Sequence, residues 1–459
     1  MTVKRLTLCL LALAVATAPA KVTAQAFGLN EIGTCALARG FAATGAPCND
    51  ASVLFWNPAA ATRLNGLSVY AGAAGVSLAG TFQADYTGFE EENDAPVEVP
   101  PHVFVNYRRG RLAYGLGVYV PYGLTSEWKD DFSGRFSVLR ASLATIYIQP
   151  NIAFDIVPDR VSIGGGPVIG RSSVELKQAL DLSTVATPLG PTLGQLGIAP
   201  GTEFGVASLE GDAIAYGFHV GLHARVSPTV QLGARYLSSL KFEYDDAEAT
   251  FTQTLTGLVL GGTVAPPFVA GTEVDQLVQG QFSGTGLLTS QKVSTRITHP
   301  LQFAFGLGYT GLPNTTLTAD YNLIGWRAFD VLPVNFENAP DQELIEDYVD
   351  AWAIRTGAEY IFGNGFAGRA GFSFAKTPAP DETVTALLPD QDRFNYSLGV
   401  GIPIAGRFAL DAGYLRVDTQ GRRGRIADRA SRDQTAQTLN TGFYTLDANI
   451  FSLSLKAQF

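Results

Sequence analysis

The chain ends in residues 450–459 (IFSLSLKAQF), which alternate between apolar and polar side chains. The apolar positions are Phe451, Leu453, Leu455, Ala457 and Phe459, and the residues between them are Ser452, Ser454, Lys456 and Gln458. Successive side chains of a β-strand point to opposite faces, so this alternation predicts a strand with one apolar and one polar face. What the apolar face contacts, lipid or a protein core, decides the fold.

The same alternation recurs along most of the chain. In residues 352–362 (WAIRTGAEYIF), for example, Trp352 and Ile354 share one face while Arg355 and Glu359 share the other. Comparable segments are residues 145–156, 218–226, 302–310, 316–326 and 407–417. Strands of a buried parallel sheet have continuous apolar runs instead. The sequence therefore predicts antiparallel, two-faced strands.

The composition suits a protein that crosses a membrane with strands. Of the 459 residues, 46% are hydrophobic and 16% are charged, and the mean hydropathy is +0.13. A spanning helix needs about 20 consecutive apolar residues, and no internal segment approaches that length. If the chain spans a bilayer, it is predicted to do so as strands.

The N-terminus has the features of a secretory signal peptide. Lys4 and Arg5 precede an apolar run at residues 6–16, which is too short to cross a membrane. The small residues that follow predict cleavage after Ala24 or Ala26. Residues 1–26 are therefore predicted to be removed on export.

Export would leave an acidic chain with two cysteines. Loss of Lys4, Arg5 and Lys21 changes the formal net charge from −10 to 29 − 42 = −13, which argues against nucleic acid as a partner. In an oxidising compartment, Cys35 and Cys48 are predicted to form a disulfide. Two free buried thiols are the alternative.

The connections between the predicted strands alternate in length. Short turns at residues 108–110, 157–160, 227–228 and 363–365 alternate with long segments near 122–142, 177–212, 247–292, 327–348, 377–392 and 419–445. Every long segment therefore emerges at one end, which is typical of outer-membrane barrels and not of soluble sandwiches. The predicted fold is all-β, a transmembrane antiparallel β-barrel of about fourteen strands, with its apolar wall facing lipid.

A barrel of this width needs a plug. Side chains fill eight-stranded barrels, whereas barrels of about sixteen strands leave an aqueous channel. Residues 27–66 are rich in small side chains and are long enough to fold into the lumen. The predicted parts are a signal peptide at 1–26, a hatch at 27–66 and a barrel at 67–459, with long extracellular loops near 177–212 and 247–292.

Several motifs follow one another in a specific order. FGLNE (residues 27–31) and NPA (57–59) lie in the predicted hatch, and further motifs lie in residues 120–154, 320–326 and 352–401. Together they resemble the FadL family of outer-membrane transporters for long-chain fatty acids and other hydrophobic compounds. The resemblance covers nearly all of the predicted mature chain. It implies a hatch-plugged barrel of fourteen strands that carries out no chemical reaction.

The resemblance also implies a mechanism. A hydrophobic groove on the extracellular loops would capture cargo, which would then leave sideways through a gap in the barrel wall. No ATP site or energy-coupling segment is evident, so transport is expected to be passive. A general hydrophilic porin and a surface ligand receptor are the alternatives.

Two long loops are unusually apolar for extracellular segments. Contiguous exposed apolar surface often marks a binding site, and Leu193, Leu196, Leu258, Leu260 and Phe268 are the predicted groove lining. The alternative is that the two loops pack on each other and cap the barrel.

A fatty acid would need a cation for its carboxylate once it leaves water. The predicted lumen-facing cations are Arg225, Arg235, Arg355 and Arg369, and the predicted lumen-facing acids are Asp155, Asp320, Glu359 and Asp411. Most of these charges are expected to pair with one another. Both fatty acids and neutral hydrocarbons therefore remain open as cargo.

Enzymatic and metal-dependent functions find little support. His219 and His223 are separated by about 13 Å on a strand, at roughly 3.3 Å per residue, so they are not expected to share a metal ion. The sequence also lacks the Gly-x-Ser-x-Gly motif of hydrolases. No enzyme activity, metal or cofactor is predicted.

Two short segments are candidates for gating. Pro58 fixes its own φ and biases Asn57 away from helix, so Asn57, Pro58 and Ala59 are predicted to anchor the hatch at a rigid bend. Pro121 cannot donate to a strand ladder and Gly123 loosens it, so this pair is predicted to mark the lateral opening.

The remaining predictions concern partners. The barrel insertion machinery is expected to recognise the terminal Phe459. Arg422, Arg423 and Arg425, in a basic cluster at residues 421–432, are predicted to contact lipopolysaccharide phosphates, with a solvated loop as the alternative. The other expected partners are outer-membrane lipid and hydrophobic small molecules, and the chain is expected to be a monomer.

Overall fold

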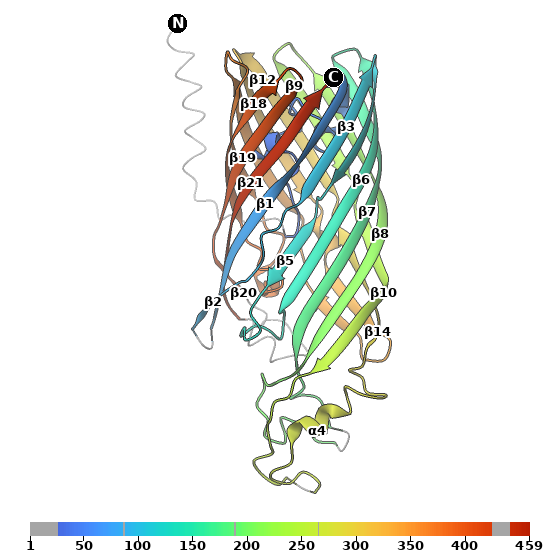
Figure 1. Ribbon diagram of the computed structural model, residues 1–459, viewed down its shortest axis with the longest axis vertical. Coiled ribbons are helices and arrows are strands. Elements are labelled where there is room, and N and C mark those ends of the chain that lie inside the picture. Colours follow the sequence, from blue (N-terminus) through green and yellow to red (C-terminus); the bar gives the residue numbers. More distant parts are fainter. Residues whose placement is uncertain (1–25, 86–87, 188–189, 265, 425–440) are drawn as a thin grey trace.

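The computed structural model describes residues 26–85, 88–187, 190–264, 266–424 and 441–459. They form a tall barrel of tilted strands, with short turns at one end and long loops at the other (Figure 1). Residues 1–25 of the predicted signal peptide lie outside the described part. In that part, no helix is long and apolar enough to cross a bilayer.

The wall is a closed ring of fourteen antiparallel strands, as predicted. In ring order they are β1 (Gly66–Ala84), β3 (Pro101–Arg109), β4 (Leu112–Tyr119), β6 (Arg140–Val157), β7 (Val161–Asp181), β8 (Glu203–Arg225), β9 (Val230–Leu237), β12 (Gln302–Leu312), β13 (Thr315–Ile324), β16 (Ala351–Ile361), β17 (Ala367–Ala375), β18 (Arg393–Ala405), β19 (Phe408–Thr419) and β21 (Gly442–Gln458). Pairing of β1 with β21 closes the ring. Closure leaves no sheet edge unpaired against lipid.

Shorter elements extend the wall at the loop end or lie inside it. The additional strands are β2 (Glu90–Glu92), β5 (Gly123–Glu127), β10 (Leu240–Gln253), β11 (Gln291–His299), β14 (Val331–Phe336), β15 (Gln342–Ile345) and β20 (Arg422–Gly424). The helical elements are α2 (Thr34–Leu37), α3 (Val53–Trp56), η1 (Pro58–Arg63), α4 (Val274–Gln279), η2 (Trp326–Ala328) and η3 (Asp381–Thr383).

The last strand confirms the two-faced pattern. In β21, Phe451 is 64% exposed and Leu453 is also exposed on the outer wall, whereas Ser454 is 1% exposed and faces the lumen. An outward apolar face and an inward polar face are what a transmembrane barrel requires. Short turns belong to the periplasmic end of such barrels and long loops to the extracellular end.

The long strands continue past the predicted loop boundaries. β7 ends at Asp181 and β8 begins at Glu203, while β10 continues to Gln253. These extensions pair with one another beyond the main ring, because alternating β-forming residues continue there. The loops that include residues 182–202 and 254–290 then project from the barrel around α4 (Figure 1).

Residues 26–65, called the hatch below, fill the lumen and are hydrogen-bonded to the wall. Asp320 Oδ2 accepts hydrogen bonds from Ala43 N (2.8 Å) and Thr44 N (2.6 Å). Asn57 Nδ2 donates to Leu222 O on β8 at 3.0 Å. These bonds satisfy buried polar groups on both partners, which would otherwise destabilise the fold.

Glycines in the wall allow the hatch backbone to approach closely. A Cβ atom on Gly306 would lie 2.3 Å from Gly45 N, and one on Gly371 would lie 2.0 Å from Gly40 N. A Cβ atom on Gly233 would lie 2.0 Å from the carbonyl oxygen of Thr44. Any larger residue at these positions would collide with hatch backbone. The wall and the hatch therefore fit each other at the level of single atoms.

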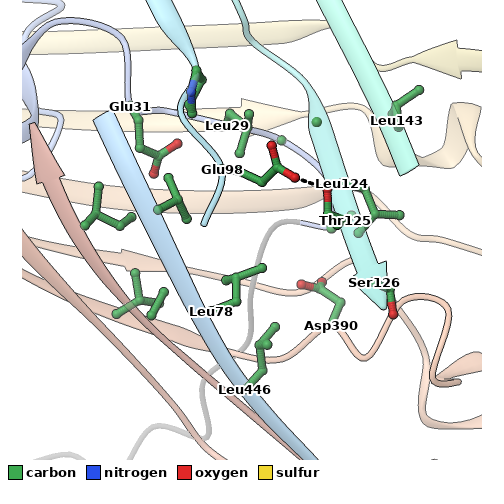
Figure 2. Close-up of a pocket in the computed structure, with 18 of the residues that line it drawn as sticks. Leu29, Glu31, Leu78, Glu98, Leu124, Thr125, Ser126, Leu143, Asp390 and Leu446 are labelled. Carbon is green, nitrogen blue, oxygen red and sulfur yellow. Dashed lines mark hydrogen bonds between the residues drawn. The ribbon is translucent and has the colours of Figure 1, made fainter. Parts of the chain in front are cut away.

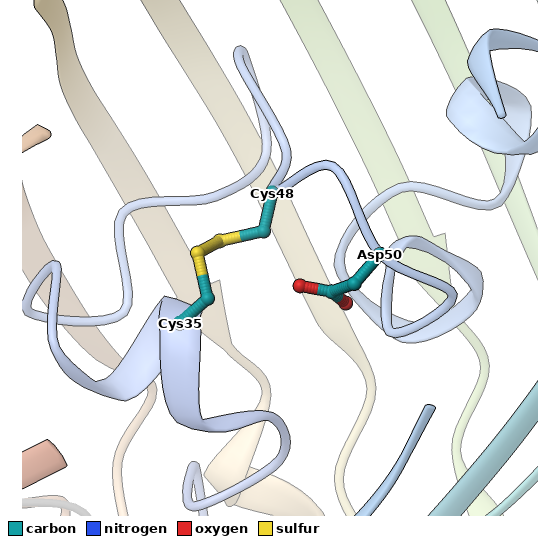
Figure 3. Close-up of side chains that lie close together, drawn as sticks. All are labelled: Cys35, Cys48 and Asp50. Carbon is teal, nitrogen blue, oxygen red and sulfur yellow. A yellow bond between two sulfur atoms is a disulfide. The ribbon is translucent and has the colours of Figure 1, made fainter. Parts of the chain in front are cut away.

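A disulfide joins Cys35 and Cys48 inside the hatch (Figure 3). Asp50 lies beside it and accepts hydrogen bonds from the backbone and hydroxyl of Ser52. Within the described residues, these two cysteines and Asp50 are the one group with the spacing of metal ligands. Cysteine binds metals as the thiolate, and both sulfur atoms are engaged in the disulfide.

Replacing Cys35 and Cys48 with serine is expected to loosen the hatch and leave the barrel intact. The bridge closes a loop across 13 residues of sequence separation, so its loss should destabilise the hatch by about 3 kcal/mol. Hydrogen exchange of amides 35–48 should then accelerate by roughly a hundredfold. Amides of β7 provide the internal control, and unchanged exchange in the hatch would contradict the prediction.

Candidate transport site

The barrel wall is interrupted at residues 120–122. β4 ends at Tyr119 and β5 begins at Gly123. Pro121 has no backbone N–H and cannot donate to the ladder. Among the strands described, β4 pairs with β3 and β6, whereas β5 pairs with β6 alone. Beyond Tyr119 the chain therefore no longer pairs with β3, and this change lies at the residues for which the sequence predicted a lateral opening.

This loss of pairing leaves a lateral gap, defined as the space between residues 95–101 and 120–126. The chain before β3, residues 93–100, runs beside β1 instead. At the loop end of the gap, Asp94 N donates to Glu127 O at 2.7 Å. Between these two ends, no backbone hydrogen bond joins the two described segments.

The first residues of the hatch cover the gap from inside. Leu29 N donates to Pro121 O (2.9 Å), and Gly123 N donates to Phe27 O (3.0 Å). A Cβ atom on Gly123 would lie 2.9 Å from Leu29 Cδ1, so glycine permits this close approach. Residues 26–31, called the N-terminal segment below, thus pair with the interrupted strand by backbone hydrogen bonds.

A cavity of about 360 Å³ lies between the N-terminal segment and the lateral gap. Figure 2 shows Leu78, Leu124, Leu143 and Leu446 among its apolar side chains, with Leu29 at the hatch side. Ligand sites of this size are typically apolar with a few placed polar groups.

The cavity reaches the outer surface of the barrel. Its lining includes Val99 and Ile146, which are 57% and 47% exposed. Ile146 belongs to the outward, lipid-facing side of β6. One continuous space therefore joins the N-terminal segment in the lumen to the lipid-facing wall.

Acidic groups outnumber cations around this cavity. The acids are Glu31, Glu98, Asp390 and Asp447, and Arg393 is the one cation among the described lining residues. Arg393 Nη2 lies 3.4 Å from Asp390 Oδ1 and donates to Ala26 O at 3.1 Å. Burial raises the pKa of Glu31, and its backbone hydrogen bonds and Arg393 oppose that effect.

The four predicted carboxylate contacts lie outside the cavity lining. Arg235 packs over the Phe55 ring and donates to Gln302 at 2.9 Å. Arg355 donates to Asn30 Oδ1 at 2.8 Å beneath the N-terminal segment. Each contacts the hatch from the wall.

The other two predicted cations differ in their surroundings. Arg369 forms ion pairs with Glu359 (2.6 Å) and Asp411 (2.5 Å). Arg225 lies at the periplasmic end of β8. The alternation of the sequence predicted only the face of each arginine, because it carries no information about the height of a residue along the barrel.

The predicted groove residues contribute to a separate apolar cluster in the extracellular loops. Leu193, Leu196, Leu260 and Phe268 are buried there with Val274 and Val278 of α4, whereas Leu258 is exposed. In this conformation the two loops pack on each other, the arrangement given above as the alternative to a groove.

The predicted hatch anchor and the two strand histidines lie away from the cavity at the lateral gap. Asn57 and Pro58 contact the wall at Gly221 and lie outside the cavity lining. His219 and His223 are buried, and His219 Nδ1 lies 3.0 Å from Gln149 Oε1.

The described part of the basic cluster forms ion pairs. Arg422 pairs with Asp381 and Arg423 with Asp85. Arg425 and the rest of that cluster lie outside the described residues.

Several cavity residues were missed by the sequence analysis. Glu31 belongs to the FGLNE motif that opens the predicted mature chain, so a signal was present. Glu98 precedes β3, whereas Asp390 and Arg393 lie three residues apart at the start of β18, far away in sequence. Only the closed barrel brings them together.

Comparison with known proteins identifies the fold and the class. Residues 13–459 match the protein family described as outer membrane protein transport protein (OMPP1/FadL/TodX). The chain belongs to the FadL family. FadL proteins are outer-membrane transporters of fatty acids and hydrocarbons and are not enzymes. This chain is accordingly an outer-membrane protein that crosses the bilayer with strands.

Individual FadL-family relatives are distant in sequence. The long-chain fatty acid transport protein of Salmonella typhi is 24% identical over 413 residues, covering 88% of this chain and 89% of that protein. The 47 kDa outer membrane protein of Pasteurella multocida is 26% identical over 424 residues, covering 90% and 92%.

Solved structures share the FadL fold. A Pseudomonas aeruginosa FadL homologue superposes with a TM-score of 0.79 at 21% identity, covering 95% of this chain and all of that one (100%). The Pseudomonas putida toluene transporter TodX superposes with a TM-score of 0.67 at 16% identity, covering 95% and 100%. At these identities the likeness shows the fold alone.

Proposed function

We propose that this protein carries hydrophobic molecules passively across the lipopolysaccharide-bearing leaflet and releases them sideways into the membrane. The observation that carries this proposal is a cavity that contacts both the N-terminal segment and the outward-facing residues Val99 and Ile146. An apolar molecule in this cavity can reach lipid without passing through water. The wall interruption at Pro121 supports the same route.

Capture takes place at the extracellular loops. Leu255, Val259 and Val264 are exposed there, beside the buried cluster around Leu193 and Phe268. Covering such surface stabilises by about 25 cal/mol per Å². A hydrophobic molecule therefore has a reason to adsorb on these loops before it reaches the cavity.

The moving part of the hatch is the N-terminal segment. It is held to the wall interruption by two backbone hydrogen bonds, those of Leu29 and Gly123. Two arginines of the wall also reach it, since Arg393 donates to Ala26 O and Arg355 to Asn30 Oδ1. The rest of the hatch is cross-linked internally by the disulfide and is bonded to the wall by Asp320 and Asn57. Asn57, Pro58 and Ala59 then act as the fixed anchor about which the N-terminal segment shifts.

The preferred cargo is uncharged. A carboxylate in the cavity would face Glu31, Glu98 and Asp390, while Arg393 is already engaged by Asp390 and Ala26. Like charges brought together in a desolvated site are strongly unfavourable. Hydrocarbons and other neutral apolar molecules avoid this penalty.

A matched pair of substrates tests the cargo preference. Myristyl alcohol and myristate have the same hydrocarbon chain and differ at the head group. At neutral pH, uptake of the alcohol should therefore reach half-saturation at a concentration about tenfold lower than uptake of myristate does. Glu98→Gln should narrow the difference, whereas Glu243→Gln, at an exposed site outside the cavity lining, should not. Equal or preferred uptake of myristate would contradict the proposal.

Three partner assignments complete the proposal. The Phe459 ring is half exposed on the outer wall beside Arg407, a position accessible to the insertion machinery. Arg422, Arg423 and Arg425 contact lipopolysaccharide phosphates through guanidinium groups. The ring closes within one chain, so each chain has a complete lumen of its own, as a monomeric transport unit requires.

A further inference from the structure

A second pocket, of about 190 Å³, lies between the hatch and the periplasmic end of the wall. It is polar, and it is separate from the cavity at the lateral gap. Arg63 lines it from the hatch, and Arg108, Arg160, His223 and Arg225 line it from the wall. We call it the arginine pocket.

The arginine pocket carries an excess of positive charge. Four guanidinium groups and two carboxylates line it, which leaves two positive charges without a counter-charge. Both carboxylates belong to one arginine, since Arg108 Nη2 lies 3.0 Å from Asp155 Oδ2 and 3.5 Å from Asp159 Oδ1. Among the described residues, Arg63, Arg160 and Arg225 form no ion pair.

Two nitrogen atoms in the arginine pocket, Arg63 Nη1 and His223 Nε2, are buried without a hydrogen-bond partner in the described protein. Arg63 Nη1 is a donor, whereas His223 Nε2, in a side chain only 4% exposed, donates in one of its two tautomers. Buried donors are nearly always paired in folded proteins. Burial, together with the charges of Arg225 and Arg39, lowers the pKa of Arg63 to about 10. An anion would relieve both the missing hydrogen bonds and the repulsion.

We propose that the arginine pocket binds a phosphate group. A phosphate monoester carries about −1.5 to −2 charges at pH 7 and three strong acceptor oxygens, which matches the charge excess and the unpaired donors. Guanidinium groups bind phosphate in a fork geometry. The source is either free inorganic phosphate or the phosphate monoester head group of a lipid in the periplasmic leaflet, as in phosphatidic acid.

Bound phosphate would join the hatch to the wall. Arg63 is the last residue of η1 in the hatch, whereas Arg160 and Arg225 belong to the turn after β6 and to the end of β8. An anion held by all three therefore fastens the periplasmic end of the hatch. The N-terminal segment at the lateral gap stays free to shift, because it does not contact this pocket.

Titration calorimetry of the full-length mature protein with inorganic phosphate, in a non-ionic detergent, tests the site. We expect saturable one-to-one binding, weakened about tenfold or more by Arg225→Gln and by Arg63→Gln. Arg225 is exposed, so its replacement should leave folding intact. Arg171→Gln, at an exposed arginine on the outer wall that pairs with Asp212, should bind as the wild type does.

Further experiments distinguish free phosphate from a lipid head group and specific binding from non-specific binding. Monomeric dihexanoyl phosphatidic acid that displaces phosphate at a lower concentration would assign the site to a lipid head group, and failure to compete would assign it to free phosphate. Phosphate should also slow hydrogen exchange at amides 59–65 in the wild type and not in Arg225→Gln. The absence of saturable binding, equal affinity for chloride, or unchanged binding in both variants would overturn the proposal.

Discussion

A short covalent bridge across the lateral gap is expected to abolish uptake of hydrophobic molecules. Thr125 Oγ1 donates to Glu98 Oε1 across the gap at 2.8 Å, so Glu98→Cys with Thr125→Cys gives two thiols that a short bis-methanethiosulfonate reagent can link. The bridge would hold residues 93–100 on β5 and close the cavity toward lipid. Uptake of labelled toluene should fall to the background of cells that lack the protein.

The controls for this bridge come from the same chain. Each single cysteine variant, treated with the same reagent, should retain uptake, and reductant should restore uptake in the double variant. Cys35 and Cys48 do not react with the reagent because they form a buried disulfide. Full uptake by the bridged protein would contradict lateral exit and would favour a route along the lumen.

Enlarging two wall glycines that touch the hatch is expected to open the lumen to water. The double variant Gly306→Val with Gly371→Val places side-chain atoms on the backbone of Gly45 and Gly40, within 2.3 Å even at the Cβ position. Overpacking costs about 1–3 kcal/mol per site, and hatch backbone offers no rotamer that could adjust. The hatch should no longer pack against the lumen wall, and sugar permeation into proteoliposomes should rise from background to the level of an open barrel.

The matched control is Gly75→Val in β1. This glycine lies on the outward face, and its nearest Cβ neighbour would be Phe451 O at 3.8 Å, so the same substitution should leave the barrel sealed. Heat-modifiable gel mobility reports whether each variant still forms a closed barrel. Sealed liposomes from a correctly folded double variant would show that the glycine contacts do not hold the hatch in place.

The barrel could be predicted from the sequence because the features that indicate it lie within short segments of the chain. Two-residue periodicity and the alternation of turn lengths are both visible in the chain, and each follows from strands that separate lipid from a lumen. The C-terminal strand illustrates this point, since its outward Phe451 and inward Ser454 follow directly from the pattern. Pro121 likewise led to the prediction of a lateral opening, because proline lacks the donor that a ladder needs.

The site was harder to predict because it depends on the position of each residue along the barrel axis and on packing between segments that are distant in sequence. Alternation assigns Arg235 and Arg355 to the lumen, but it does not reveal that the hatch covers them. Apolar loop composition likewise does not distinguish a groove from a packed cluster. Leu193 and Leu260 are buried against α4 because two loops that are distant in sequence meet there.

Uptake of three labelled compounds, by a host lacking its own FadL-family transporter, tests the central claim most directly. Toluene, myristate and a small sugar would be compared in cells that express this chain. We expect saturable uptake of toluene, weaker uptake of myristate, and sugar uptake no higher than in cells without the protein. Sugar uptake that rises linearly with concentration and accompanies unsaturable toluene uptake would contradict a plugged, hydrophobe-selective channel and would indicate a general porin.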